Sequence, residues 1–283
     1  MRGLILFFFA AASVLVAQPR RIVSTAPSIT ETLFALGLGD RVIGVSQHCH
    51  YPPEANSRPR VGSYLKPNVE VIVGLRPDLV IVQAKTNDAA AQLERVKVNV
   101  LEVEHGDLEK MFAGMRLIAS RCGVPERGAK LEADLRARLA AIRKRTESLP
   151  RRSLVFIVGR SPGSLENLIA VGKGSYLNEL IAIAGGVNAL AGTPMPYPKV
   201  SLESIIGLNP DVLVDMGDMA ETLGVTEEHK RNVVALWNRR PALKAVAQKR
   251  VFAVAADIFV VPGPRVAEAA EAFAKMLHPE VMP

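Results

Sequence analysis

Cysteine is nearly absent from this chain of 283 residues, since Cys49 and Cys122 are the only two. Two thiols do not form the disulfide framework that holds small secreted domains together, so an ordinary hydrophobic core must stabilise the fold. A single bridge and two unpaired buried thiols are both compatible with the sequence. Charged residues make up 22% and hydrophobic residues 49% of the chain, a globular balance that excludes extended disorder.

Long hydrophobic runs are lacking outside the N-terminus. After Arg2, residues 3–17 are uncharged and end in small and apolar residues before Gln18 and Pro19. As a helix this run would span about 22 Å, less than the ~30 Å core of a bilayer, so a membrane anchor is only the alternative reading. The pattern is typical of a secretory signal at residues 1–17. No cysteine lies near the cleavage point, which predicts a periplasmic or secreted protein without a lipid anchor.

Aromatic residues are scarce, at 5% of the chain, although the formal net charge is +7. Much of the basic excess lies in residues 136–145 and 151–152, and neither run contains an aromatic residue. A nucleic-acid groove would interleave basic and aromatic side chains. Apolar residues recur at helical spacing within the first run, which indicates the solvated face of a helix. We therefore expect no nucleic-acid partner.

Short β-branched runs alternate with helical patterns along the chain. The strand-like runs cover residues 22–24, 42–46, 79–82, 98–103, 154–158, 168–171, 212–214 and 251–255. This alternation predicts an α/β fold with mostly parallel sheets. Ser28 and Glu31 have the spacing of a capping box and predict a helix that starts at Ser28 and ends near Gly37.

An internal repeat is the most informative feature. Residues 68–80 (NVEVIVGLRPDLV) match residues 201–213 (SLESIIGLNPDVL) at a constant offset of 133. Each copy predicts a short helix, a turn at Pro-Asp and a buried strand. A looser match at an offset of 147 relates residues 28–39 to residues 175–186. Two units repeated in the same order predict two similar, Rossmann-like lobes.

A helix-forming segment joins the two halves. Residues 125–149 are rich in Ala, Leu, Arg, Lys and Glu and would reach roughly 36 Å as one helix. Such a helix acts as a stiff spacer, whereas a Gly/Ser linker would let the lobes move freely. We predict an N-terminal lobe at residues 18–124, a bridging helix at 125–149 and a C-terminal lobe at 150–283. The ligand cleft is expected between the lobes.

Two short motifs resemble catalytic or phosphate-binding loops, and each lacks an essential residue. The sequence GRSPG contains Ser161 in a nucleophile-elbow pattern, but Pro162 has no N–H group for an oxyanion hole. In the phosphate-loop pattern that ends at residues 172–175 (GKGS), Asn167 replaces a required glycine. Ser175 is instead expected to cap a helix. An extracellular serine hydrolase is therefore a disfavoured alternative, and we predict no catalytic residues.

His48, Cys49 and His50 place three potential metal ligands in succession. A closed metal site needs about four ligands, and neighbours in an extended segment point to opposite faces. We predict no metal site and interpret His48 as lining a ligand cleft, with a free-metal-ion binder as the alternative.

Tyr64 and Tyr197 each stand four residues ahead of a repeat copy, which predicts aromatic platforms on both sides of one cleft.

An ordered set of motifs carries a family resemblance. They are RIVSTAPSITE at 21–31, VIGVS at 42–46, YPP at 51–53, the repeat segment at 68–81, PYPKVSLE at 196–203 and PGPR at 262–265. Together they resemble the substrate-binding proteins of ABC importers for cobalamin, ferric siderophores and haem, with most similarity to the cobalamin binders. The resemblance covers essentially the whole mature chain.

This resemblance implies a non-enzymatic protein without an intrinsic cofactor that delivers cobalamin or a related corrinoid to an ABC importer. A ferric siderophore and haem are the alternative ligands. It implies that His48, Tyr64, Gln83, Tyr197 and Asp257 contact the ligand. In the cobalamin binders a tyrosine corresponds to His48, and tryptophans correspond to Tyr64, Gln83 and Tyr197.

The resemblance also implies a partner and a docking surface. Glu70 and Glu203, one in each repeat copy, are expected to dock onto arginines of a permease dimer that works with its ATPase. Val260 and Val261 occupy positions where the family has polar or charged residues. The protein itself is expected to be a monomer.

Overall fold

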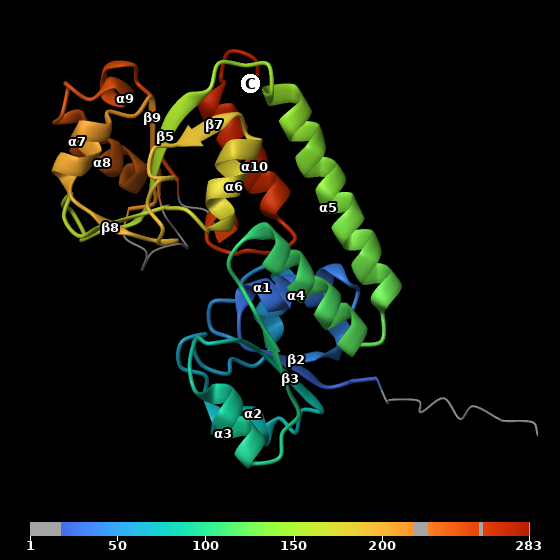
Figure 1. Ribbon diagram of the computed structural model, residues 1–283. Coiled ribbons are helices and arrows are strands. Elements are labelled where there is room, and N and C mark those ends of the chain that lie inside the picture. The colour runs from blue at the N-terminus through green and yellow to red at the C-terminus, as the bar shows by residue number, and fades with distance from the viewer. Residues whose placement is uncertain (1–17, 218–225, 255–256, 283) are drawn as a thin grey trace, which may run out of the picture.

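Two separate β-sheets form the centres of two lobes, which are joined by the long helix α5 (Pro125–Thr146), as Figure 1 shows. The computed structural model describes residues 18–217, 226–254 and 257–282. The signal segment predicted at residues 1–17 lies outside these described residues. No helix among them is long and apolar enough to cross a bilayer.

The N-terminal lobe is built on a four-stranded parallel sheet in the order β2-β1-β3-β4. Its strands are β1 (Ile22–Ser24), β2 (Val42–Val45), β3 (Leu79–Gln83) and β4 (Val100–Val103). Its helices are α1 (Pro27–Ala35), α2 (Val69–Gly74), α3 (Ala89–Arg95) and α4 (Leu108–Arg121), with single 3₁₀ turns at Gly39–Arg41 and Pro53–Ser57. The predicted runs form strands because their β-branched side chains pack on both faces of the sheet.

The C-terminal lobe contains a six-stranded mixed sheet in the order β10-β9-β5-β6-β8, with β7 paired to β5. Its strands are β5 (Arg152–Gly159), β6 (Leu168–Ala170), β7 (Gly186–Asn188), β8 (Lys199–Val200), β9 (Val212–Asp215) and β10 (Val251–Ala253). Its helices are α6 (Tyr176–Ile183), α7 (Leu202–Leu208), α8 (Glu227–Asn238), α9 (Lys244–Ala247) and α10 (Val266–Leu277), with a 3₁₀ turn at Asp257–Phe259. The predicted α/β class with mostly parallel strands is confirmed; β6 pairs antiparallel with β5 and β8.

Each lobe has three layers, because successive side chains of a strand point to opposite faces. In the N-terminal lobe, Ile22 packs towards α1 and α4, whereas its neighbour Val23 packs towards α2 and α3. In the C-terminal lobe, Phe156 packs towards α6 and α10, whereas Val155 packs towards α7, α8 and α9. Helix α5 contacts α4, α6 and α10. The layers that contain α2 and α7 therefore lie on the faces of the sheets away from α5.

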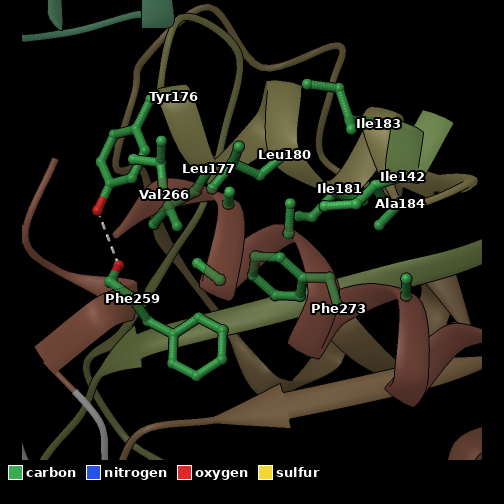
Figure 2. Packing of buried hydrophobic residues seen from close by; sticks show 14 of the residues in the cluster. Ile142, Tyr176, Leu177, Leu180, Ile181, Ile183, Ala184, Phe259, Val266 and Phe273 are labelled. Atoms are coloured by element: carbon green, nitrogen blue, oxygen red, sulfur yellow. Dashed lines mark hydrogen bonds between the residues drawn. The ribbon is translucent and has the colours of Figure 1, made fainter. Parts of the chain in front are cut away.

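The inner core of the C-terminal lobe is aromatic. Phe156, Phe259 and Phe273 contact one another edge to face, with centroid separations of 5.1–5.7 Å. Figure 2 shows the Tyr176 hydroxyl donating to the Phe259 carbonyl at 2.9 Å, which attaches the start of α6 to the 3₁₀ turn at Asp257–Phe259. On the other side of the sheet Trp237 is fully buried.

Helix α5 belongs to both cores. Leu131 packs against the apolar clusters of both lobes, and Leu135, Leu139 and Ile142 are buried in the C-terminal one. The prediction extended this helix to residue 149, but it ends at Thr146. The Thr146 hydroxyl lies 2.9 Å from the Ile183 carbonyl of α6, so the last turn is held by a neighbouring helix.

The repeat units adopt the predicted helix, turn and strand in both lobes. Asn68 and Ser201 cap α2 and α7 by accepting backbone N–H bonds of 3.1 Å. Ser175 caps α6 in the same way, as predicted. The capping box at Ser28 is wrong: Ala26 is the N-cap of α1, and no side chain caps this helix. Pro27 has a dihedral angle suited to the first helical position, so the helix begins one residue earlier.

The two cysteines are free. Cys49 and Cys122 are both fully buried in the core of the N-terminal lobe and form no disulfide. Burial raises the pKa of the Cys122 thiol to about 11, so it stays protonated at neutral pH. Of the two possibilities that the sequence left open, the structure shows two unpaired buried thiols.

Glu31, which the sequence placed in a capping box, forms an ion pair between the two lobes. Arg265, which precedes α10, donates through Nε to Glu31 Oε2 at 2.9 Å and through Nη2 to the other carboxylate oxygen. The same guanidinium donates to both oxygens of Asp257, at 2.8 and 2.9 Å. Burial raises the pKa of Glu31 despite the opposing effect of Arg265. One buried arginine therefore holds a carboxylate from each lobe.

Replacing Arg265 with Met should destabilise the protein by roughly 3–5 kcal/mol, because removing one partner leaves the buried carboxylate of Glu31 unpaired. Adding Glu31→Gln to Arg265→Met should recover part of this loss. The measurement is the free energy of unfolding in urea at neutral pH. Arg138→Met on the exposed face of α5 is the control, with a change near zero. A loss that persists unchanged in the double variant would contradict an ionic origin.

His278, at the end of α10, is fully buried against Gly185 and Thr146. Burial, and then the nearby charge of Arg152, lower its pKa below the ordinary value of 6.5. The folded state therefore favours the neutral imidazole, while the unfolded chain takes up a proton near pH 6.5.

We expect His278 to contribute stability that is fully present above pH 6.5 and is lost as the pH falls below that value, because only the unfolded state gains a proton there. Unfolding free energies should be measured from pH 8 to pH 5 for the natural protein and for His278→Gln. On acidification, the unfolding free energy of the natural protein should fall more than that of the variant. Parallel curves would show that His278 does not titrate differently on folding.

Candidate functional site

The candidate site lies where the two sheets present the ends of their parallel strands. In open α/β sheets, ligands bind outside the carboxyl ends of the strands. In the N-terminal lobe, His48 follows β2 and Gln83 is the last residue of β3. In the C-terminal lobe, Asp257 follows β10, and Tyr197 lies in the loop before β8.

His48 and Tyr64 are in contact on the N-terminal lobe. Their rings meet edge to face with centroids 5.7 Å apart, and Tyr64 also packs against the core of this lobe. The Asn87 side chain donates to the Tyr64 carbonyl at 2.7 Å and so fixes the loop. Partial burial, and then the nearby His50, lower the pKa of His48. Its exposed imidazole is therefore predominantly neutral at neutral pH and able to accept a hydrogen bond.

Gln83 faces the other lobe across a small pocket. Its side-chain amide donates to the Ser28 hydroxyl at 3.4 Å, and both residues line the pocket with His105 and with Pro262 of the C-terminal lobe. The pocket has a volume of about 20 Å³. This is room for roughly one water molecule, so a large ligand does not fit inside it.

Tyr197 is held at its hydroxyl, and part of the residue is exposed. Its hydroxyl accepts a bond of 3.2 Å from Ser175, the cap of α6, and 43% of the residue is exposed. Burial of the hydroxyl raises the pKa of Tyr197. The Pro196 carbonyl accepts a bond of 2.8 Å from the Gly172 N–H, which fastens the loop. A Cβ at Gly172 would collide with the Met195 carbonyl, so this close approach requires glycine.

Both carboxylate oxygens of Asp257 accept bonds from Arg265, and the Asp257 side chain remains 29% exposed. The Arg265 guanidinium also lies over the Tyr51 ring, 4.0 Å from its centroid. Arg265 therefore brings together Asp257, Glu31 and Tyr51 at the boundary of the two lobes. Tyr51 and Arg265 lie in the quoted YPP and PGPR motifs, but sequence reasoning assigned neither of them a role.

Exposed apolar side chains flank both predicted tyrosines. Leu65 adjoins Tyr64, and Met195 lies two residues before Tyr197; each is 58% exposed. Sequence reasoning missed both residues, although their positions beside the paired tyrosines were a usable signal. Tyr51 adds a third aromatic ring that is 43% exposed. Each lobe thus presents an aromatic and an aliphatic side chain to solvent.

The consecutive His48, Cys49 and His50 do not converge. Cys49 points into the core, where the Thr30 hydroxyl donates to its sulfur at 3.1 Å, and burial raises the pKa of the thiol. Across the parts of the chain that the structure describes, no group of three or more His, Cys, Asp and Glu side chains is placed to hold a metal ion.

The hydrolase-like motif lies in a different local structure from a nucleophile elbow. Such an elbow joins a strand to a helix. Here β5 ends before Arg160, and the chain turns and returns as strand β6. The Asn167 amide donates to the Ser161 hydroxyl at 2.8 Å. Arg160 beside it pairs with the buried Asp215 at 2.9 Å, and Trp237 donates to the same carboxylate, so these charges are used structurally.

Glu70 and Glu203 occupy equivalent positions in the first turns of α2 and α7, and both are exposed. Neither takes part in an ion pair within the described residues. The pKa of Glu203 is lowered by a hydrogen bond from its own backbone N–H and, to a lesser extent, by one from the Ser201 hydroxyl. Both carboxylates are exposed and are therefore accessible to a partner.

Comparison with known proteins agrees with this architecture. A vitamin B12-binding protein of Vibrio cholerae is 30% identical over 271 residues, covering 94% of this chain and 92% of that protein. A crystal structure of a periplasmic vitamin B12 binding protein from Vibrio cholerae has a TM-score of 0.75 and 28% identity, covering 92% of this chain and 97% of the other. An ABC transporter substrate-binding lipoprotein of Bacillus subtilis is 28% identical, covering 93% of this chain and 81% of that protein.

Similarity extends to a periplasmic haem-binding protein from Roseiflexus, with a TM-score of 0.76 and 28% identity, covering 91% of this chain and 99% of the other. The sequence profile described as periplasmic binding protein matches residues 22–257, which include both sheets and the helix between them. With this match and two α/β lobes bridged by one helix, the chain belongs to the periplasmic binding protein family.

Proposed function

We propose that this protein binds cobalamin or a related corrinoid in the periplasm and delivers it to an ABC importer. The observation that carries the proposal is the set of exposed aromatic and aliphatic side chains on both lobes, namely Tyr51, Leu65, Met195 and Tyr197, with the half-buried Tyr64 beside them. A corrinoid is large and largely flat, so apolar faces on two sides provide most of its contact area. The similarity to the vitamin B12-binding protein of Vibrio cholerae supports this ligand.

Binding in this proposal requires no chemistry by the protein. The tyrosine rings contact the faces of the macrocycle, while His48 and Gln83 hydrogen-bond to its polar side groups. Asp257 acts indirectly, because it holds Arg265 beside Tyr51. The small pocket beside Gln83 has room for about one water molecule, so in this proposal the corrinoid lies against exposed faces of the two lobes. The protein carries no catalytic residue and no cofactor of its own.

Haem is the second candidate ligand. The contact between His48 and Tyr64 places two side chains capable of binding a haem iron at one surface. The similarity to the Roseiflexus haem-binding protein supports the same reading. A ferric siderophore is a third ligand of the same class, and no particular contact favours it. All three are planar or compact metal chelates, so the metal belongs to the cargo.

The partner in this proposal is a permease dimer with its ATPase. Glu70 and Glu203 are equivalent carboxylates on the two lobes and dock onto basic side chains of the permease. A two-fold symmetric dimer presents the same basic site twice, which suits one carboxylate per lobe. The similarity to an ABC transporter substrate-binding lipoprotein of Bacillus subtilis supports this partner.

The proposed route to the periplasm uses the signal segment at residues 1–17, which is removed on export. The exported protein acts as a monomer in this proposal. The two lobes and the bridging helix α5 (Pro125–Thr146) form one binding unit in this proposal.

Titration with cyanocobalamin should show binding with a dissociation constant below 1 μM, which corresponds to more than about 8 kcal/mol. Replacing Tyr64 and Tyr197 together with Ala should weaken binding by roughly 30-fold or about 2 kcal/mol, because buried aromatic anchors dominate such sites. Calorimetry measures both. The control is Tyr64→Phe with Tyr197→Phe, which keeps the rings and should stay close to the natural affinity.

Two results would change the ligand assignment in different ways. Tight binding of haem or a ferric siderophore without any binding of cyanocobalamin would overturn the corrinoid and leave the binding role intact. Unchanged affinity in the double Ala variant would overturn the aromatic platforms, whichever ligand binds.

Reversing both docking charges with Glu70→Arg and Glu203→Arg should leave ligand affinity and thermal stability intact but abolish uptake. Two charges 4 Å apart interact by about 4 kcal/mol at an effective dielectric constant near 20, so reversal of both is severe. The measurement is uptake of labelled cyanocobalamin, or of haem if the purified protein binds haem. Glu94→Arg with Glu228→Arg, one exposed glutamate per lobe, is the matched control. Normal uptake by the Glu70 and Glu203 variant would refute the docking role.

A further inference from the structure

Equivalent exposed aliphatic residues adjoin the two glutamates. Val73 lies three residues after Glu70 and is 40% exposed, and Ile206 lies three residues after Glu203 and is 43% exposed. Residues three apart on a helix are neighbours on its surface, so each pair shares one face. A single exposed aliphatic residue needs no explanation. An exposed aliphatic residue that recurs beside a carboxylate in both copies of a repeat does need an explanation.

The packing of these helices does not require the exposed side chains. Ile72 of α2 and Ile205 of α7 are fully buried and are the buried residues of their helices. Val73 and Ile206 come directly after them and point away from the core. A polar residue at either position would satisfy the fold and the usual pattern of a surface helix.

In each copy of the repeat, a glycine follows the exposed aliphatic residue, and no contact within this chain requires a glycine there. Gly74 and Gly207 lie in the last turns of α2 and α7 and do not adopt a positive φ. A Cβ at either glycine would meet nothing within 4 Å. Glycine in a helix is less favourable than alanine, and here neither strain nor crowding compensates for that cost. An open glycine on a surface does allow another chain to approach the backbone closely.

The three residues form one face in each lobe, because positions i, i+3 and i+4 of a helix are adjacent. We call the surface formed by Glu70, Val73 and Gly74 on α2, and by their equivalents Glu203, Ile206 and Gly207 on α7, the paired helix face. Both helices lie in the layers away from α5, and Figure 1 shows them on the sides of their lobes remote from that helix.

We propose that the paired helix face is a permease-docking surface in which the aliphatic side chain and the bare glycine contribute to binding alongside the carboxylate. This inference rests on the proposed function and specifies the chemistry of its partner. The partner surface carries a basic side chain for the glutamate and, beside it, an apolar segment that packs over Val73 or Ile206 and reaches the glycine backbone. The equivalence of the two faces requires a partner with the same site twice, as a two-fold symmetric dimer provides.

Close packing at the glycines provides a sharp test. Gly74→Gln with Gly207→Gln places a side chain where this chain has open space, so folding and ligand affinity should stay intact, and the melting temperature should stay equal or rise. The same side chains should obstruct the partner. Purified protein loaded with labelled cyanocobalamin, or with haem if that is what it binds, is added to spheroplasts freed of periplasmic contents. Uptake is then measured against protein concentration.

The half-saturating concentration should rise at least tenfold for the double glycine variant, and each single variant should account for a comparable part of the shift. Val73→Ser with Ile206→Ser should act in the same direction. Gly192→Gln is the matched glycine control, because a Cβ there also meets nothing within 4 Å. Leu117→Ser with Val187→Ser is the aliphatic control, since both residues are 44% exposed. Neither control should change uptake.

The outcomes separate this inference from the docking role of the glutamates. If Glu70→Arg with Glu203→Arg abolishes uptake while the double glycine variant behaves like the natural protein, the glutamates dock and the apolar part of the face does not. An equal loss in the controls, or a loss from one lobe alone, overturns the inference as well. If neither the charge reversal nor the glycine variant changes uptake, the docking proposal itself is wrong.

Discussion

The structure depends on one helix that belongs to two hydrophobic cores. Leu131 of α5 packs against both lobes, Leu139 continues into the C-terminal core, and Gly128 lets the helix approach Ala119 of α4 without a Cβ between them. A rigid helix anchored at both ends restricts rotation of one lobe against the other. The carboxyl ends of both sheets therefore remain turned towards the same region, which is the condition for a site made from two lobes.

Within that region the charged groups are already paired with one another. Arg265 is shared by Glu31 and Asp257, and Arg160 is bound to Asp215. A buried ion that is satisfied by the protein gains little from a ligand and loses much if its partner is taken away. The surface left unsatisfied on both lobes is aromatic and aliphatic. This distribution favours a large, flat and mostly apolar ligand over a bare metal ion.

In the proposed function, the internal repeat keeps ligand binding and permease docking on different parts of each lobe. Loops at the carboxyl ends of the strands and just ahead of the repeat units carry the residues that we propose to face the ligand, such as Tyr64 and Tyr197. The repeat helices α2 and α7 lie in the layers away from α5, where their exposed residues are free for a partner. Because both lobes repeat one pattern, the proposed ligand site has two similar walls and the proposed docking surface has two similar helix faces.

The sequence by itself determined the α/β class, eight of the strand positions, the repeat and the bridging helix, since these depend on local periodicity and helix propensity. Only the tertiary structure decided that Glu31 pairs with Arg265, 234 residues away, that Cys49 and Cys122 stay unbridged, and that β7 and β8 pair with longer strands. The paired residues lie far apart in the chain, and β7 and β8 are two or three residues long. Neither feature leaves a local pattern, because contacts between distant segments form only when the whole chain has folded.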